Sequence, residues 1–157
     1  MASHAPSTAP DPQDRLYPTP ARRDLLDAIA AGQVHTIAGT ATRADTGRRV
    51  TAAVTEMAQA GWASHPTQAP GRVELTVVGR AVRAVRLLDY GTRIVAETGP
   101  CAEPTELGAA DRTAGRWTVT VAGSSARCRS RTLAAGELLH RAVRAVAAGE
   151  QTPEPNP

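Results

Sequence analysis

The sequence predicts an α+β fold, with a helix-and-hairpin unit in the first half and a small β-rich module closed by a C-terminal helix in the second. Three observations predict this class. Apolar residues recur with helical spacing in two segments of the first half and again near the end of the chain. Segments 72–78 and 116–121 alternate apolar and polar residues, which is typical of strands with one buried face. Clusters of glycine and proline separate these segments and mark turns.

The first helix is predicted to begin at Thr19 and Pro20 and to end near Gly32. Threonine suits an N-cap, proline suits the first helical position, and glycine suits the residue after a helix. Its apolar stripe consists of Leu25, Leu26 and Ile29. A short strand is then predicted at 33–38.

A polar segment and a second helix follow. Residues 39–47 are expected to form a loop or a single helical turn. The second helix is predicted over 48–60, with Asp45 or Thr46 as its cap. Its buried stripe consists of Val50, Val54, Met57, Ala58 and Gly61. Two short strands around the turn-rich segment 66–71 then predict a β-hairpin, and residues 79–86 are predicted to be helical.

The second half is predicted to be a small sheet closed by a helix. Strands are expected at 92–97 and 116–121, with residues 98–115 as a loop between them because they are rich in glycine, proline and acidic residues. Residues 126–129 would return beside the second strand after a turn at 123–125. The final helix would be capped by Ser130 or Thr132 and would run to about Ala148, stopping at Gly149.

Both ends of the chain are rich in proline and poor in apolar groups, so they cannot bury enough surface to offset the entropy of ordering. The predicted organisation is therefore a disordered tail at 1–20, a first unit at 21–86, a second module at 87–149 and a disordered tail at 150–157.

Arginine supplies all 18 basic side chains, and the chain has no lysine. This bias, together with abundant alanine, is typical of a high-GC genome such as an actinobacterial one. Residues 21–86 hold nine arginines against five acidic residues (+4), whereas residues 87–150 hold eight against seven (+1). The basic excess of the first half favours a polyanionic partner there, because arginine binds phosphate oxygens with two donors at once.

No pattern predicts catalysis, a metal site or a cofactor. Ser124, Ser125, His140 and Asp111 supply the residue types of a catalytic triad, but no nucleophile elbow surrounds either serine. The chain also lacks a phosphate loop, a dinucleotide fingerprint and any histidine or cysteine pair with metal-ligand spacing. We therefore expect a non-catalytic protein.

The cysteines and the hydropathy predict a cytoplasmic protein without a membrane partner. Cys101 and Cys128 are expected to be unpaired, with a disulfide as the less favoured alternative. The arginines on both sides of Cys128 could lower its pKa, although a structural cysteine is the favoured interpretation. No apolar run approaches the roughly 20 residues that span a bilayer, and no signal segment opens the chain.

Two motifs in the first half carry a family resemblance. Residues 47–62 read Gly-Arg-Arg-Val-Thr-Ala-Ala-Val-Thr-Glu-Met-Ala-Gln-Ala-Gly-Trp, and residues 75–80 read Leu-Thr-Val-Val-Gly-Arg. Their order and spacing resemble the winged-helix family of bacterial transcription regulators, over residues 21–86 only. In that family a recognition helix commonly ends in a glycine-aromatic turn, and the second wing strand commonly ends in Leu-Thr-x-x-Gly-Arg. The resemblance implies a recognition helix at about 48–60 and a wing at about 62–78.

The resemblance also implies which residues would contact double-stranded DNA. The outer side chains near the start of the recognition helix would face base edges in the major groove, where arginine can bind guanine and threonine can contact the thymine methyl group. They are Arg48, Arg49, Thr51, Ala52 and Thr55. The wing would meet phosphates or the minor groove through His65, Gln68 and Arg72. Further phosphate contacts would come from Arg22, Arg23 and Arg43.

The sequence thus predicts a DNA-binding transcriptional regulator that acts as a homodimer, so that two recognition helices reach adjacent half-sites. One alternative is a protein-interaction adaptor that uses the winged helix as a docking surface. Another is RNA binding through the second half, whose pattern from Trp117 to Leu139 weakly resembles the C-terminal part of double-stranded-RNA-binding domains without their lysines.

Overall fold

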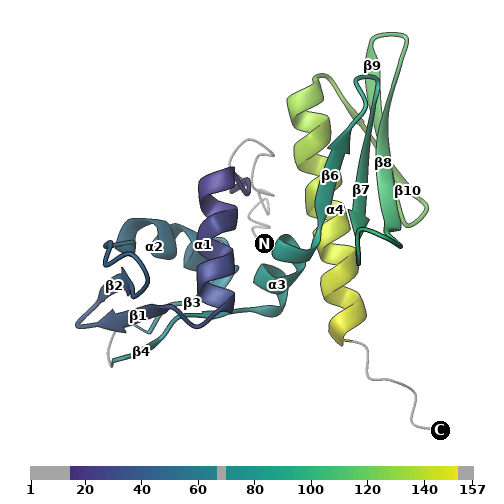
Figure 1. Ribbon diagram of the computed structural model, residues 1–157. Helices are drawn as coiled ribbons and strands as arrows, with labels where there is room; N and C mark the ends of the chain where they lie inside the picture. The colour runs from purple at the N-terminus through teal and green to yellow at the C-terminus, as the bar shows by residue number, and fades with distance from the viewer. Residues whose placement is uncertain (1–14, 67–69, 152–157) are drawn as a thin grey trace, which may run out of the picture.

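The computed structural model describes residues 15–66 and 70–151, with side chains up to Gly149. These residues form an α+β fold, as predicted, with four helices and three small sheets. Figure 1 shows two lobes: α1, α2 and several short strands form one, and a sheet covered by α4 forms the other, with α3 between them.

Helix α1 (Pro20–Ala30) forms as the sequence predicts. The Thr19 hydroxyl accepts a hydrogen bond from the backbone N–H of Arg22, so it caps the helix. Gly32 follows the helix with φ 73°, a left-handed conformation that glycine adopts without strain. The buried face consists of Leu25, Leu26, Ala28 and Ile29.

The segment after α1 forms a β-hairpin. The loop or helical turn expected at 39–47 was therefore wrong for residues 40–43, which form a strand. Strand β1 (Val34–Ile37) pairs antiparallel with β2 (Thr40–Arg43). The two residues that connect them, Ala38 and Gly39, have φ of 50° and 79°. Such a two-residue turn matches the twist of the flanking strands and closes a hairpin tightly. A strand therefore lies in a segment for which the sequence suggested at most one helical turn.

A hairpin forms around the predicted turn, but its strands are very short, and the strand expected over 72–78 is interrupted at Val73 and ends at Leu75. Strand β3 (Ala63–Ser64) pairs antiparallel with β5 (Glu74–Leu75), and β4 (Gly71–Arg72) pairs with β1. The order of the three-stranded sheet is β2-β1-β4. Val73, between β4 and β5, is fully buried.

Helix α2 (Thr51–Gln59) begins three residues later than predicted, and neither Asp45 nor Thr46 caps it. Residues 48–50 continue the sheet instead: the backbone N–H of Arg43 donates to the Arg48 carbonyl, and the N–H of Val50 donates to the Ala41 carbonyl. These bonds hold the backbone extended up to the helix start. Val54 and Met57 are fully buried, as predicted.

Helix α3 (Val77–Ala84) confirms the helix predicted at 79–86, although it begins two residues earlier. Thr76 caps it, because its Oγ1 accepts a hydrogen bond from the N–H of Gly79 at 3.0 Å. Gly79 packs directly on the backbone: a Cβ atom there would lie 1.8 Å from the carbonyl oxygen of Trp62. Only glycine therefore lets α3 approach the start of β3 this closely.

The second lobe is a five-stranded antiparallel sheet in which each strand pairs with the next along the chain, in the order β10-β9-β8-β7-β6. One face of this sheet packs against α4 (Figure 1). The strands are β6 (Arg86–Asp89), β7 (Arg93–Thr98), β8 (Thr105–Thr113), β9 (Arg116–Val121) and β10 (Ser124–Cys128).

Two of these strands were not predicted. Strand β6 was missed, and β8 lies within the expected loop 98–115. The centre of β8 has small residues because it must pass close to its neighbours: a Cβ at Gly108 would lie 2.4 Å from the Thr120 carbonyl oxygen. Its buried positions are occupied by alanine, so the alternation of large apolar residues that marks a strand is absent.

Helix α4 (Arg131–Gln151) runs past Gly149, where we expected it to stop. Ser130 caps it, because its Oγ accepts a hydrogen bond from the N–H of Leu133 at 3.2 Å. Residues 15–19, assigned from sequence to a tail, pack on the fold: Pro18 is buried, and the Arg15 guanidinium pairs with Glu137 at 2.9 Å. The rest of the predicted tails, 1–14 and 152–157, lies outside the described residues.

Candidate nucleic-acid interface

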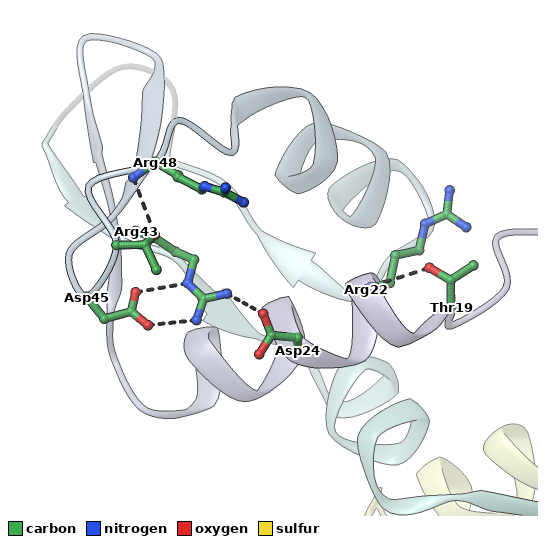
Figure 2. A network of polar contacts seen from close by, with 7 residues as sticks. Thr19, Arg22, Asp24, Arg43, Asp45 and Arg48 are labelled. Atoms are coloured by element: carbon green, nitrogen blue, oxygen red, sulfur yellow. Dashed lines mark hydrogen bonds and ion pairs between the residues drawn. The ribbon is translucent and has the colours of Figure 1, made fainter.

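The arginines expected to contact phosphate differ in whether they already have partners. Arg43 lies between two carboxylates (Figure 2): its Nε and Nη2 donate to Asp45 at 2.9 and 2.7 Å, and its Nη1 donates to Asp24 at 2.5 Å. The hydrogen bond from Arg43 lowers the pKa of Asp45, and the two carboxylates raise the pKa of Arg43. Arg43 is thus neutralised within the fold.

Arg22 and Arg23 are also engaged. The Arg22 guanidinium donates to the Tyr17 carbonyl at 2.9 Å and to Glu56 at 3.3 Å. Arg23 donates to the Val85 carbonyl at 3.2 Å. These two arginines and Arg43 therefore hold α1 to neighbouring segments, which differs from the phosphate-contacting role that the resemblance implied.

A second group of arginines has no such partners. Among the described residues, no acidic side chain or backbone carbonyl accepts a hydrogen bond from the guanidinium of Arg48, Arg49 or Arg72. All three side chains are exposed. Their charge is therefore available to an external anion.

Strand register brings two of these arginines onto one face of the sheet. Arg49 forms a β-bridge with Thr42, Thr42 pairs with His35, and His35 pairs with Arg72. Paired residues project from the same face of a sheet, so the four side chains form one row across it. We call Arg49, Thr42, His35 and Arg72 the basic row.

The basic row lies on the outer face of the sheet. Val34, Thr36 and Ala41, which alternate with it along β1 and β2, are buried, whereas His35 and Arg72 are exposed. Ile37, at the end of β1, projects on the same side as His35 and is 69% exposed. The outer face therefore combines cations, polar groups and one exposed apolar residue at the hairpin tip.

The start of α2 adjoins this row. Its N-cap residue, Val50, gives no side-chain hydrogen bond, so side-chain capping does not satisfy the first N–H groups of the helix. Of the residues expected to face bases, Ala52 is exposed and Thr55 is half-buried. The Thr51 hydroxyl accepts a hydrogen bond from the Ala41 N–H at 3.0 Å, so it fixes α2 to β2.

The other predicted wing residues add little to this surface. His65 is half-buried, and its Nε2 atom is buried with no hydrogen-bond partner among the described residues. Gln68 lies outside the described residues. His35 and Thr42 were not predicted as site residues, because their place beside Arg49 depends on strand β2, which the sequence did not indicate.

The second lobe holds a further set of arginines without acidic partners. On the outer sheet face, Arg86 pairs with Glu97 at 3.2 Å, and Arg93 pairs with Asp111 at 2.8 Å. By contrast, no ion pair forms within the described part of the chain at the remaining sheet arginines. They are Arg112 on β8, Arg116 on β9, Arg127 on β10 and Arg129, which follows β10.

The residue types of a triad are engaged elsewhere. The Ser124 hydroxyl accepts a hydrogen bond from Arg141 at 2.8 Å, and Asp111 binds Arg93. Both cysteines are free, and burial followed by the charge of Glu137 raises the pKa of Cys128, so the lowered value considered from sequence was wrong. Within 15–66 and 70–151 no cluster of three or more metal-ligating side chains occurs.

Comparisons with known protein families, curated proteins and solved structures found no match to this chain. No helix in the described part of the chain is long and apolar enough to cross a membrane.

Proposed function

We propose that the first half of this protein binds double-stranded DNA and that the protein is a cytoplasmic transcriptional regulator. The observation that carries the proposal is the segregation of charge. Arg48, Arg49 and Arg72 have no internal acidic partner among the described residues and lie next to the start of α2, whereas the other arginines expected to bind phosphate are neutralised or engaged.

Phosphate oxygens are the ligands that this surface would accept. Arginine forks onto phosphate with two donors, and the uncapped N–H groups at the start of α2 favour an anion at the same end. Arginines at a helix start oppose the helix dipole, so an anion there also removes an unfavourable contact. The hairpin tip with Ile37 could enter a minor groove, where apolar side chains act as wedges.

Sequence-specific reading would come from the exposed side of α2 and from the wing, as the winged-helix resemblance implies. A homodimer would place two such surfaces on adjacent half-sites. In this arrangement the β1–β2 hairpin replaces the helix that usually precedes the recognition helix.

The test is binding of the full chain to random-sequence duplex DNA over a range of salt concentrations. For Arg49→Gln with Arg72→Gln, we expect weaker binding and a salt slope smaller by about 1.8, because each phosphate that is no longer neutralised lowers the slope by ~0.9. The matched control is Arg83→Gln with Arg93→Gln, which removes the same charge from arginines that are already paired with Asp27 and Asp111. If the two double variants lost DNA affinity equally, the loss would reflect only the change in net charge. If the full chain did not bind DNA at low salt, the proposal would be refuted.

A second candidate function is RNA binding through the second lobe, favoured by the arginines of β8 to β10 that have no ion-pair partner among the described residues. We expect Arg116→Gln with Arg127→Gln and Arg129→Gln to leave duplex DNA binding unchanged if the first half alone binds nucleic acid. If this triple variant lost duplex RNA binding selectively, the second function would be supported. Partner binding that does not depend on salt would favour the adaptor alternative instead.

A further inference from the structure

A groove of about 1510 Å³ lies at the junction of the two lobes. One wall is formed by residues 15–17, by the C-terminal end of α2 and by α3. The facing wall is formed by α4. Its apolar lining includes Leu16, Trp62, Val78, Val82, Leu139 and Val143. The volume exceeds the roughly 300–1,000 Å³ of ordinary small-molecule sites, so the groove has room for a ligand along part of its length.

One region of the groove is cationic. Arg15 and Arg144 line the groove and also a smaller adjoining hollow beside the β9–β10 turn. The only carboxylate among the described residues that line this hollow, Glu137, serves two arginines: Arg15 at 2.9 Å and Arg141 at 2.7 Å. The charge of this region is therefore not balanced.

Two donors in this region lack acceptors. The Nε atom of Arg15 is buried without a hydrogen-bond partner among the described residues, and the Arg144 guanidinium has no partner in the same set. A buried donor without an acceptor is unfavourable, and an anionic oxygen is the acceptor that a guanidinium binds best. Arg144 is exposed, so an anion in the groove can reach its guanidinium, whereas the Arg15 Nε atom is enclosed by protein. An apolar groove with an exposed cation at one position matches a molecule with an apolar body and one negative group.

We propose that this groove binds a small amphipathic organic anion, such as a medium-chain carboxylate, with its negative group at Arg144, beside Arg15, and its apolar body along the groove beside α4. Gln59, Ala60 and Trp62, at the end of α2 and the start of β3, lie on the same groove. A bound anion would therefore contact both lobes. We expect binding of the anion to change the affinity for DNA through this contact. Only this expectation rests on the proposed function.

The experiment uses the full chain and the fluorescent anion 8-anilinonaphthalene-1-sulfonate, displaced by dodecanoate or by uncharged dodecanol. Gly136 lines the groove, and a Cβ there meets no atom within 4 Å. Gly136→Leu fills this space while improving helix propensity, so the variant should fold at least as well as the parent. We expect it to bind both the probe and dodecanoate on the order of tenfold more weakly. Gly149→Leu, in the same helix but outside the groove lining, is the matched control.

The charge requirement is tested separately. We expect dodecanoate to displace the probe on the order of tenfold better than dodecanol does, and Arg144→Gln to remove that preference, whereas Arg127→Gln keeps it. Equal displacement by the two competitors, or unchanged binding in Gly136→Leu, would overturn the proposal. If Gly136→Leu instead altered only the oligomeric mass, the groove would be an interface between copies. Dodecanoate binding without DNA binding would leave the proposal standing and refute the proposed function alone.

Discussion

Arg43 and Arg49 carry the same charge on paired stretches of backbone, yet they face different surroundings. Arg43 pairs with Val34 and projects toward α1, where Asp24 meets it, whereas Arg49 pairs with Thr42 and projects from the opposite face. Asp45 has a lowered pKa because Arg43 binds its ionised form, so the stabilisation from this pair is present at neutral pH and is lost as the pH falls through that lowered value. The face of the sheet from which each side chain projects therefore decides which arginine is structural and which is available to a ligand.

His140 predicts a pH dependence of stability. Burial first, and then the charge of Arg15, lower its pKa, with Arg144 and Arg141 acting the same way and Glu137 opposing them. The folded state thus resists protonation, and the unfolded state binds the proton more readily below its ordinary pKa of about 6.5. We expect stability to be full above that pH and to decline below it, as measured by urea unfolding from pH 5 to 8. His140→Gln should flatten this decline, and an equal decline in that variant would contradict the assignment.

Alanine substitutions at two glycines are expected to change the free energy of unfolding in opposite directions. Gly79→Ala places a methyl group against the Trp62 carbonyl, and because that atom is backbone the helix must move. We expect a loss of about 3 kcal/mol or more in the free energy of unfolding. Gly136→Ala, where a Cβ meets nothing, should gain about 0.5–1 kcal/mol because alanine favours a helix. Chemical denaturation measures both, and a tolerated Gly79→Ala would show that α3 is not held against Trp62.

Three hairpins of the fold share one type of turn. Ala38-Gly39, Ala114-Gly115 and Ala122-Gly123 each connect two strands with both residues at positive φ, between 50° and 79°. Alanine is strained in this region, whereas asparagine tolerates it.

We therefore expect Ala38→Asn to stabilise the protein by about 0.5–1 kcal/mol without altering the fold. Ala38→Val should destabilise it, because a β-branched residue is disfavoured at positive φ. Urea denaturation of the two variants checks the sign, and an Ala38→Asn variant no more stable than the parent would count against the turn geometry.

The sequence could predict the elements with strong periodicity but not those set by pairing. Helix α1, the buried residues Val54 and Met57 and strand β9 follow from spacing alone. Strand β8 has Leu107 as its one large apolar residue, because close packing at Gly108 leaves no room for a side chain there. Strand β2 depends on an Ala-Gly turn, a weaker signal than Asn-Gly, and the basic row depends in turn on β2. The sequence therefore predicted the arginines of the candidate site but not Thr42 and His35, which lie between Arg49 and Arg72 in the basic row.

One hydrophobic cluster joins the two lobes. It extends from Leu25 and Val54 in the first lobe, through Val82 of α3 and Val85 just after it, to Trp117 and Leu138 in the second. Because α3 packs on both α1 and α4, neither lobe can lose its packing without exposing apolar surface of the other. We infer that the described fold is one cooperative unit.

This cooperativity predicts a single unfolding transition. Trp62 lies in the first lobe and Trp117 in the second, and both are buried, so Trp62→Phe and Trp117→Phe each leave one tryptophan that reports on one lobe. We expect the two fluorescence transitions in urea to coincide once each variant is referenced to its own circular dichroism curve. Leu138→Ala, which opens a cavity in the second lobe, should lower stability by about 2–5 kcal/mol and shift the Trp62 signal as much as the Trp117 signal. Val54→Ala provides the reciprocal change in the first lobe. If Leu138→Ala moved the Trp117 transition and left that of Trp62 in place, the lobes would unfold independently, and contact across the groove could not link a bound anion to the DNA-binding surface.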